Sequence, residues 1–270
     1  MSEQNNQYRD SALNLDQAYY YTLLLLIDSN SFSYAITFRD KILGFGEGYS
    51  LHELHNPMAL KDIINSPFKK VVIGYLSSGF TLLPHYAINK EHAPDFARML
   101  DVQPNEKVLG NVLDDHNYAL CKIESRLLEG AEKFSFKDVV FYGKGLVGVI
   151  AQNSPKDDVI YLNITGNKAD YINFKDGALN FYNRFEFNSP EDLLYFTASV
   201  IGELGLPPQS VQISFSGSVT AVDKNYEQLS LYFPNVSVNR MTLFELPTEL
   251  APHKVLALMS LSLCASSEAA

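Results

Sequence analysis

Residues 38–45 of this chain read Phe-Arg-Asp-Lys-Ile-Leu-Gly-Phe, and residues 174–181 read Phe-Lys-Asp-Gly-Ala-Leu-Asn-Phe. The two stretches begin 136 positions apart. An apolar strand with a polar last residue precedes each of them, ending at Asp28 in the first case and at Asn163 in the second. We therefore expect two copies of a three-stranded meander, one opening each half of the chain. A chance resemblance between two amphipathic hairpins is the alternative interpretation.

The composition is typical of a folded protein rich in aromatic strands. The 270 residues suffice for one large domain or two of ordinary size. Hydrophobic residues make up 46% of the chain and charged residues 19%, and the sixteen Tyr and seventeen Phe favour strands. The net charge of −10 argues against nucleic acid or an anionic membrane as a partner, because phosphate contacts need clustered Lys and Arg.

Cysteine content and the N-terminal residues indicate a cytoplasmic protein. Cys121 and Cys264 lie in apolar stretches and are expected to be buried, reduced thiols. Met1–Asp10 is polar and does not read as a targeting signal. The apolar run Ala18–Ile27 is too short to span a membrane, which requires about 20 residues. No membrane span is therefore expected.

The hydrophobic pattern predicts a mixed α/β protein in two halves. A flexible leader over residues 1–18 is expected to precede a first domain, 19–155, with an inserted subdomain at about 76–104, and a second domain, 156–270. The expected strands include about 20–28, 31–39 and 42–49 in the first half and a meander over about 158–187 in the second. The expected helices include about 94–100, 125–133, 145–153, 190–204 and 252–264.

The polar turns after the first strand of each half are candidate nucleotide-binding sites. Turns that hold phosphates need glycine, so that backbone N–H groups can approach the oxygens, and an acid that holds Mg²⁺ directly or through water. Asp28 is the candidate Mg²⁺ ligand if ATP binds, and Asp170 would orient water or metal. The candidate contacts to phosphate are Ser29, Asn30, Ser31, Ser33, Thr165, Gly166 and Asn167. Ordinary polar hairpin turns are the alternative interpretation.

Two further patterns are candidates. Ser216, Gly217 and Ser218 follow a strand and enter a helix, so a nucleobase or ribose could lie over this uncovered backbone. Residues 143–148 match GxGxxG after a strand, but the acid and the parallel strand that a dinucleotide site needs do not follow. Helix–strand packing is the main interpretation of these glycines. His52 and His55 lack a third metal ligand at suitable spacing.

The order of these parts resembles the actin/Hsp70/sugar-kinase ATPase superfamily. The three turns correspond in position to its first phosphate loop, second phosphate loop and adenosine loop. The stretches Leu179–Phe187 and Pro190–Phe196 look like an uncharacterised bacterial family, a domain of unknown function with the actin-like ATPase fold. The resemblance covers about residues 20–264. It implies duplicated RNase H-like domains, each a three-stranded meander plus helices, around a central cleft.

The three turns depart from the pattern of active superfamily members. The first has Ser29-Asn30 after Asp28 where Asp-x-Gly is usual, and the second has Asn163 where a strand-end Asp is usual. The third has Ser216-Gly217 in place of paired glycines. A side chain at a phosphate-facing turn occupies the space of the oxygens and disfavours positive φ.

These departures predict a non-catalytic interaction or assembly module with protein partners or self-association. The first alternative is an ATP-binding protein, with Mg-ATP as its cofactor, that hydrolyses slowly or uses nucleotide to gate a hinge. If the protein is an enzyme, it is expected to be an ATPase or phosphotransferase. A dinucleotide-binding protein is the minor alternative.

Overall fold

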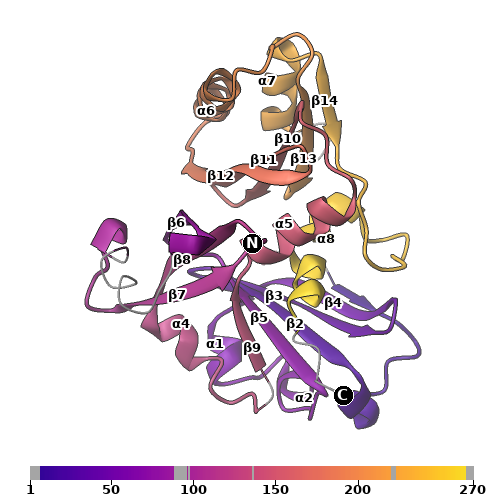
Figure 1. Cartoon of the computed structure of the whole chain (residues 1–270). Coiled ribbons are helices and arrows are strands. Elements are labelled where there is room, and N and C mark those ends of the chain that lie inside the picture. Colours follow the sequence, from indigo (N-terminus) through magenta and orange to yellow (C-terminus); the bar gives the residue numbers. More distant parts are fainter. Residues whose placement is uncertain (1–6, 88–95, 97, 136, 220–222, 266–270) are drawn as a thin grey trace. The chain divides into compact units, whose positions relative to one another are not determined.

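The computed structural model describes residues 7–87, 96, 98–135, 137–219 and 223–265 (Figure 1). The chain divides into two compact units. The first contains Met1–Gly148, Leu243–Glu249 and Leu258–Ala270, and the second contains Val149–Thr242 and Leu250–Ala257. Each unit combines a mixed β-sheet with helices, so the expected α/β class is confirmed.

The first unit is organised around a six-stranded sheet in the order β1-β4-β3-β2-β5-β9. Its central strand β2 is apolar after Thr22, because β3 and β5 pair with its two edges and Leu23, Leu24 and Leu25 are fully buried. β2, β3 and β4 form the expected antiparallel meander, and β5 and β9 extend it in parallel. The strands are β1 (Gln7–Arg9), β2 (Thr22–Ile27), β3 (Ser31–Phe38), β4 (Lys41–Ser50), β5 (Lys70–Tyr75) and β9 (Lys137–Phe141).

The segment before β2 differs from the flexible leader that we expected. Gln7–Arg9 pairs antiparallel with β4, and Leu15–Tyr20 forms the 3-10 helix η1. Asn14 caps the first turn of η1, because its side chain accepts a hydrogen bond from the Asp16 N–H at 3.0 Å. Residues 1–6 lie outside the described residues. A three-residue strand is too short to produce a period-two pattern, so its pairing depends on the available edge of β4.

A separate three-stranded antiparallel sheet has the order β6-β8-β7, and of its strands only β6 falls within the insertion expected at about 76–104. Its small core contains Leu83, Leu100 and Leu120. Of the helix expected at about 94–100, residues 94, 95 and 97 lie outside the described residues, and Arg98–Leu100 forms a 3-10 turn. The strands are β6 (Gly79–Pro84), β7 (Glu106–Val112) and β8 (Asn117–Glu124), and the helices of this unit's surface are α1 (His52–His55), α2 (Lys61–Ile64), η2 (His85–Ala87) and α4 (Ser125–Glu129).

The second unit contains a five-stranded sheet in the order β12-β11-β10-β13-β14. One face packs against α6 and α7 through a core that includes Leu162, Leu193 and Leu229 (Figure 1). Its strands are β10 (Val159–Thr165), β11 (Lys168–Lys175), β12 (Ala178–Glu186), β13 (Gln212–Gly217) and β14 (Asn235–Val238), and its helices are α6 (Pro190–Glu203) and α7 (Lys224–Tyr232). α6 begins where the sequence predicts, because Ser189 accepts a hydrogen bond from the Asp192 N–H at 3.1 Å.

The same succession of pairings occurs in both sheets. β4-β3-β2-β5-β9 and β12-β11-β10-β13-β14 each contain two antiparallel pairings followed by two parallel ones. β2 and β10 therefore occupy the same place in their sheets, and so do the turns that follow them. This repetition supports the duplicated meander, which stays a prediction.

The remaining helices are α5 (Gly143–Gln152), α8 (Pro252–Met259) and the 3-10 helix η4 (Ser260–Cys264). Within the described part of the chain, no helix has the length and apolar character needed to cross a bilayer. Cys121 and Cys264 are both buried, as expected. Burial raises the pKa of the Cys264 thiol to about 11, so this thiol is protonated and unreactive at neutral pH.

Candidate functional site

The first candidate turn is a compact polar turn between β2 and β3. The Asp28 N–H donates to the Ser31 carbonyl at 2.9 Å, and the Asp28 carboxylate accepts from the Ser29 N–H at 2.7 Å. Ser31 and Ser33 are half-buried residues of β3, and Asn30 is exposed. The structure thus brings together the five candidates that the sequence places in and just after this turn.

Arg126, at the start of α4, reaches the first turn. Its Nη2 donates to the Ser29 carbonyl at 3.0 Å, and its Nε lies 2.5 Å from Oε2 of Glu124. Hydrogen bonding to Glu124 raises the pKa of Arg126, so the guanidinium is charged. Sequence analysis missed this residue because it lies 97 positions from Ser29 and no local motif marks it.

The second candidate turn is a two-residue β-hairpin between β10 and β11. Gly166 has φ +58°, a conformation that glycine adopts without strain, and its surroundings are open. The Asn167 carbonyl accepts from the Phe187 N–H at 2.9 Å. Gly166 and Asn167 are exposed, and Thr165 is half-buried. The glycine is accounted for by the geometry of the hairpin.

Beside this hairpin, polar side chains form a row across the second sheet. Arg184, Asp170, Asn163 and Ser216 are direct partners on the adjacent strands β12, β11, β10 and β13, so their side chains share one face. Asn239 directly follows β14 in the chain. It extends the row past β13, because its N–H donates to the Phe215 carbonyl at 2.7 Å. We call these five residues the polar row. All of them are largely buried, on the face opposite the helix-covered core.

Asp170 is the charged centre of the polar row. Its Oδ1 accepts from Arg184 Nε at 2.9 Å and from the Tyr182 hydroxyl at 3.1 Å. The Asp170 side chain is 0% exposed and that of Arg184 is 8% exposed. A buried carboxylate needs such compensation, since an isolated charge loses its hydration. In this arrangement Asp170 is an ion-pair partner of Arg184, which does not fit a ligand of Mg²⁺.

Two amide atoms of the polar row lack partners. Asn163 Oδ1 and Asn239 Nδ2 are buried, with no hydrogen-bond partner among the described residues. Asn239 Oδ1 accepts from the Met241 N–H at 2.8 Å, and this bond sets which way the amide points. Asn239 also lines a polar cavity of about 710 Å³ together with Ser214, Ser237, Tyr226 and Arg240. An unsatisfied buried donor at a cavity favours a polar occupant there.

The third candidate turn, Ser216-Gly217-Ser218, packs tightly against β10. Gly217 is buried with φ +92°, and an added Cβ would lie 1.9 Å from the Ile164 carbonyl oxygen. The Ser218 N–H donates to the same carbonyl at 3.0 Å, and Ser218 is exposed. Glycine is required here by the contact between β13 and β10, whether or not a nucleobase binds.

The GxGxxG stretch, residues 143–148, forms the first part of α5. β9 and β10, the strands before and after α5, belong to different sheets, so they do not form the strand–helix–strand unit of a dinucleotide site. A Cβ at Gly145 would lie 2.7 Å from the Ser260 carbonyl oxygen. Gly145 thus permits close packing of α5 against η4, and the dinucleotide alternative is wrong on topology.

Substitutions of these glycines are expected to act in opposite directions. Gly145→Ala should destabilise the first unit by about 1–2 kcal/mol, because overpacking against backbone outweighs the gain in helix propensity. A Cβ added at Gly148 would contact only the Leu263 side chain, at 3.5 Å. Gly148→Ala should therefore stabilise the first unit by up to about 1 kcal/mol. Urea unfolding of the two variants beside the parent chain measures both values. Equal effects of the two substitutions would contradict the packing explanation.

His52 and His55 lie on the one-turn helix α1. The described residues contain no group of three or more His, Cys, Asp or Glu side chains that could hold a metal ion.

The two mixed sheets and their shared strand order define a protein with the actin-like ATPase fold. A Bacteroides thetaiotaomicron protein "with actin-like ATPase fold and unknown function" matches with TM-score 0.77 and 18% identity, over 94% of this chain and 100% of that chain. The "PilM-PilN type IV pilus biogenesis complex" matches with TM-score 0.56 and 10% identity, over 92% of this chain and 99% of the matched chain. No curated protein matches the chain.

Residues 10–236 match the family described as "Protein of unknown function (DUF3822)", and the chain belongs to this family. The resemblance to an uncharacterised family with the actin-like ATPase fold is therefore confirmed.

Proposed function

We propose that this protein is a non-catalytic interaction or assembly module built on the actin-like ATPase fold. The observation that carries the proposal is the buried ion pair between Asp170 and Arg184 in the second sheet. Hydrolysis in this fold needs an acid near the second phosphate loop to orient water or metal. Here that acid is 0% exposed and balanced by a guanidinium, and an amide, Asn163, lies near the end of β10.

The first turn supports the same proposal. Ser29 and Asn30 carry side chains where a phosphate loop would need uncovered backbone, and Arg126 holds the Ser29 carbonyl. These contacts suit a structural turn. A turn of this kind offers fewer approachable N–H groups to phosphate oxygens than a glycine loop does.

Fold analogy supports an assembly role. A chain of the PilM–PilN type IV pilus biogenesis complex has the same fold, so this fold occurs within a protein assembly. We infer that the present protein works in the cytoplasm through a protein partner or a second copy of itself. Sedimentation velocity across a concentration series tests association with a second copy, because self-association raises the mean sedimentation coefficient as the protein concentration rises.

The chain is expected to show no saturable response to nucleotide. A ligand that binds only the folded state at 100 times its Kd stabilises that state by about 2.7 kcal/mol. We expect no rise in Tm up to millimolar Mg-ATP or Mg-ADP, and no release of phosphate. Asp28→Ala is the matched control. A saturable rise in Tm that Asp28→Ala abolishes would contradict the proposal.

Binding of a nucleotide without rapid hydrolysis is the second candidate function. It is favoured by the unpaired Asn239 Nδ2, because Asn239 lines the polar cavity and its backbone N–H donates to the carbonyl of Phe215, the residue before Ser216. In this alternative Asp28 would hold Mg²⁺, Ser31 and Ser33 with the Thr165–Asn167 backbone would contact phosphate, and Gly217 would lie against adenine or ribose. Asn239→Leu removes the unsatisfied donor and keeps the bulk of the side chain, and it also removes the Oδ1 that accepts from the Met241 N–H. A nucleotide-induced rise in Tm that this variant loses would favour the second candidate.

A further inference from the structure

A second cavity, separate from the candidate turns, lies in the first unit. It has a volume of about 520 Å³, within the range of small-molecule sites. It opens at the start of β5, around Val71. Because β2 and β5 run parallel, with Thr22 opposite Lys70 and Ile27 opposite Tyr75, this is the end of the sheet remote from Asp28. The cavity is therefore independent of the proposed function.

The floor of this cavity is apolar and well packed. Ile64, Phe68, Val71 and Phe134 line it, and each is at most 6% exposed. They come from α2, the loop before β5, β5 itself and the loop before β9, so four separate segments hold the floor. Such a surface favours the flat or aliphatic body of a ligand over a hydrated one.

The rim carries positive charge. Among the eleven residues that line the cavity, two are lysines, Lys69 and Lys133, and none is Asp or Glu, in a chain whose net charge is −10. The Lys133 ammonium donates a hydrogen bond to the Leu54 carbonyl, which is a neutral acceptor. Loss of hydration lowers the pKa of Lys133, and a nearby anion would favour its charged form.

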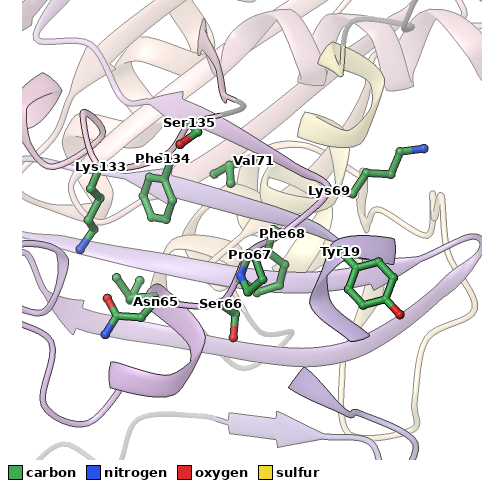
Figure 2. Close-up of a pocket in the computed structure, with 11 residues that line it drawn as sticks. Tyr19, Asn65, Ser66, Pro67, Phe68, Lys69, Val71, Lys133, Phe134 and Ser135 are labelled. Atoms are coloured by element: carbon green, nitrogen blue, oxygen red, sulfur yellow. The ribbon is translucent and has the colours of Figure 1, made fainter. Parts of the chain in front are cut away.

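Polar groups lie at both ends of the cavity, and the Ser66 and Ser135 side chains lie between them (Figure 2). Figure 2 shows Lys133 and Asn65 at one end and Tyr19 at the other, with Phe134, Pro67 and Phe68 between them. Lys69 extends away from this group in the same view. An anion beside Lys133 would therefore place the remainder of the molecule over the aromatic floor.

We propose that this cavity binds a small organic carboxylate with a flat or short aliphatic apolar body. The carboxylate pairs with the Lys133 ammonium and the Asn65 amide, and the apolar body lies on Phe68 and Phe134. The lack of acidic lining residues disfavours cationic ligands, and the apolar floor disfavours inorganic phosphate or sugars. The cavity accommodates a molecule of the size of naphthoate.

Naphthoate, an aromatic carboxylate, is the probe for the test, with the neutral naphthylmethanol beside it. Isothermal titration of the full chain should detect saturable naphthoate binding. Lys133→Met keeps the length of the side chain and removes the charge, so it should weaken the binding of naphthoate by about tenfold or more. The same variant should leave naphthylmethanol binding within about twofold. Lys107→Met, at an exposed lysine of β7 outside the cavity, is the matched control and should change neither affinity.

A second variant keeps the proposal falsifiable if Lys133→Met unfolds. Ser135 is exposed at the rim, so Ser135→Trp adds an indole that fills the cavity without disturbing the core. It should abolish the binding of both probes while the Tm stays that of the parent chain. Absence of naphthoate binding at millimolar concentration, or binding that survives Ser135→Trp, would overturn the proposal.

Discussion

Gly217→Ala is expected to destabilise the second unit by about 3–5 kcal/mol, far more than alanine at an ordinary turn glycine. Two costs combine. The residue has φ +92°, which an L side chain rarely adopts, and its Cβ would lie 1.9 Å from the Ile164 carbonyl oxygen. Relief of that contact would separate β13 from β10 and lengthen the bond between the Ser218 N–H and the same carbonyl.

Hydrogen exchange of the β10 and β13 amides as a function of urea measures this effect within the second unit. Gly166→Ala is the matched control, because Gly166 also has positive φ but stands in open space. It should cost only about 1 kcal/mol. If Gly217→Ala and Gly166→Ala destabilise the second unit equally, the close contact with Ile164 is not the reason that position 217 requires glycine.

Arg184→Met is expected to destabilise the second unit by about 3–5 kcal/mol, because it leaves the Asp170 carboxylate buried without its guanidinium partner. Asp170 is 0% exposed and lies in the middle strand of the β10–β11–β12 meander, so water cannot replace the lost charge without opening the sheet. Tyr182→Phe should cost about 1–2 kcal/mol, since it removes one hydrogen bond to the same carboxylate. Equilibrium urea unfolding provides both values.

The double variant Arg184→Met with Asp170→Leu distinguishes a buried charge from a loss of packing. Replacing both members of a buried ion pair with apolar side chains is often neutral or stabilising. The double variant should therefore recover most of the unfolding free energy that Arg184→Met loses. Lys41→Met is the exposed control, because Lys41 and Glu245 are 4.0 Å apart with side chains that are 62% and 69% exposed. It should produce no measurable change. A double variant as unstable as Arg184→Met would show that the ion pair is not the source of the effect.

These two predictions also bear on function. If the Asp170–Arg184 pair stabilises the sheet, the acid expected at the second phosphate loop has a structural role. The departures of the three turns from the glycine-rich pattern are then consistent with a module that does not hydrolyse nucleotide. The unsatisfied Asn163 Oδ1 and Asn239 Nδ2 nevertheless leave room for a polar ligand beside the row.

Local patterns were enough to predict the regular elements around each meander. Alternating or continuous apolar residues predicted β2, β3, β4 and the meander of the second unit, because a strand buried on one or both faces imposes its period on the sequence. Ser189 and Gly205 predicted the two ends of α6, since capping depends on residues within one turn. The order of these elements was also enough to recognise the actin-like fold, which the comparison with solved structures confirms.

Short edge elements could not be predicted in the same way. β1 has three residues and β14 has four, so both are too short for a period-two pattern to distinguish them from a loop. Both form because a neighbouring strand offers an unpaired edge, and that edge exists only once the sheet has assembled. The GxGxxG motif was ambiguous for a related reason, since the need for Gly145 comes from Ser260, far along the chain.

The sequence alone thus determined the fold class, the meanders and the positions of the polar turns, because these depend on residues close together in the chain. The partners of the polar residues came only from the folded chain: Arg184 beside Asp170, Arg126 on the Ser29 carbonyl, and Gly217 against Ile164. Strand register and loop packing set these distances, and neither is encoded in any one segment. A carboxylate after a strand reads the same in a sequence whether it would hold a metal ion or an arginine; its neighbours in space make the difference.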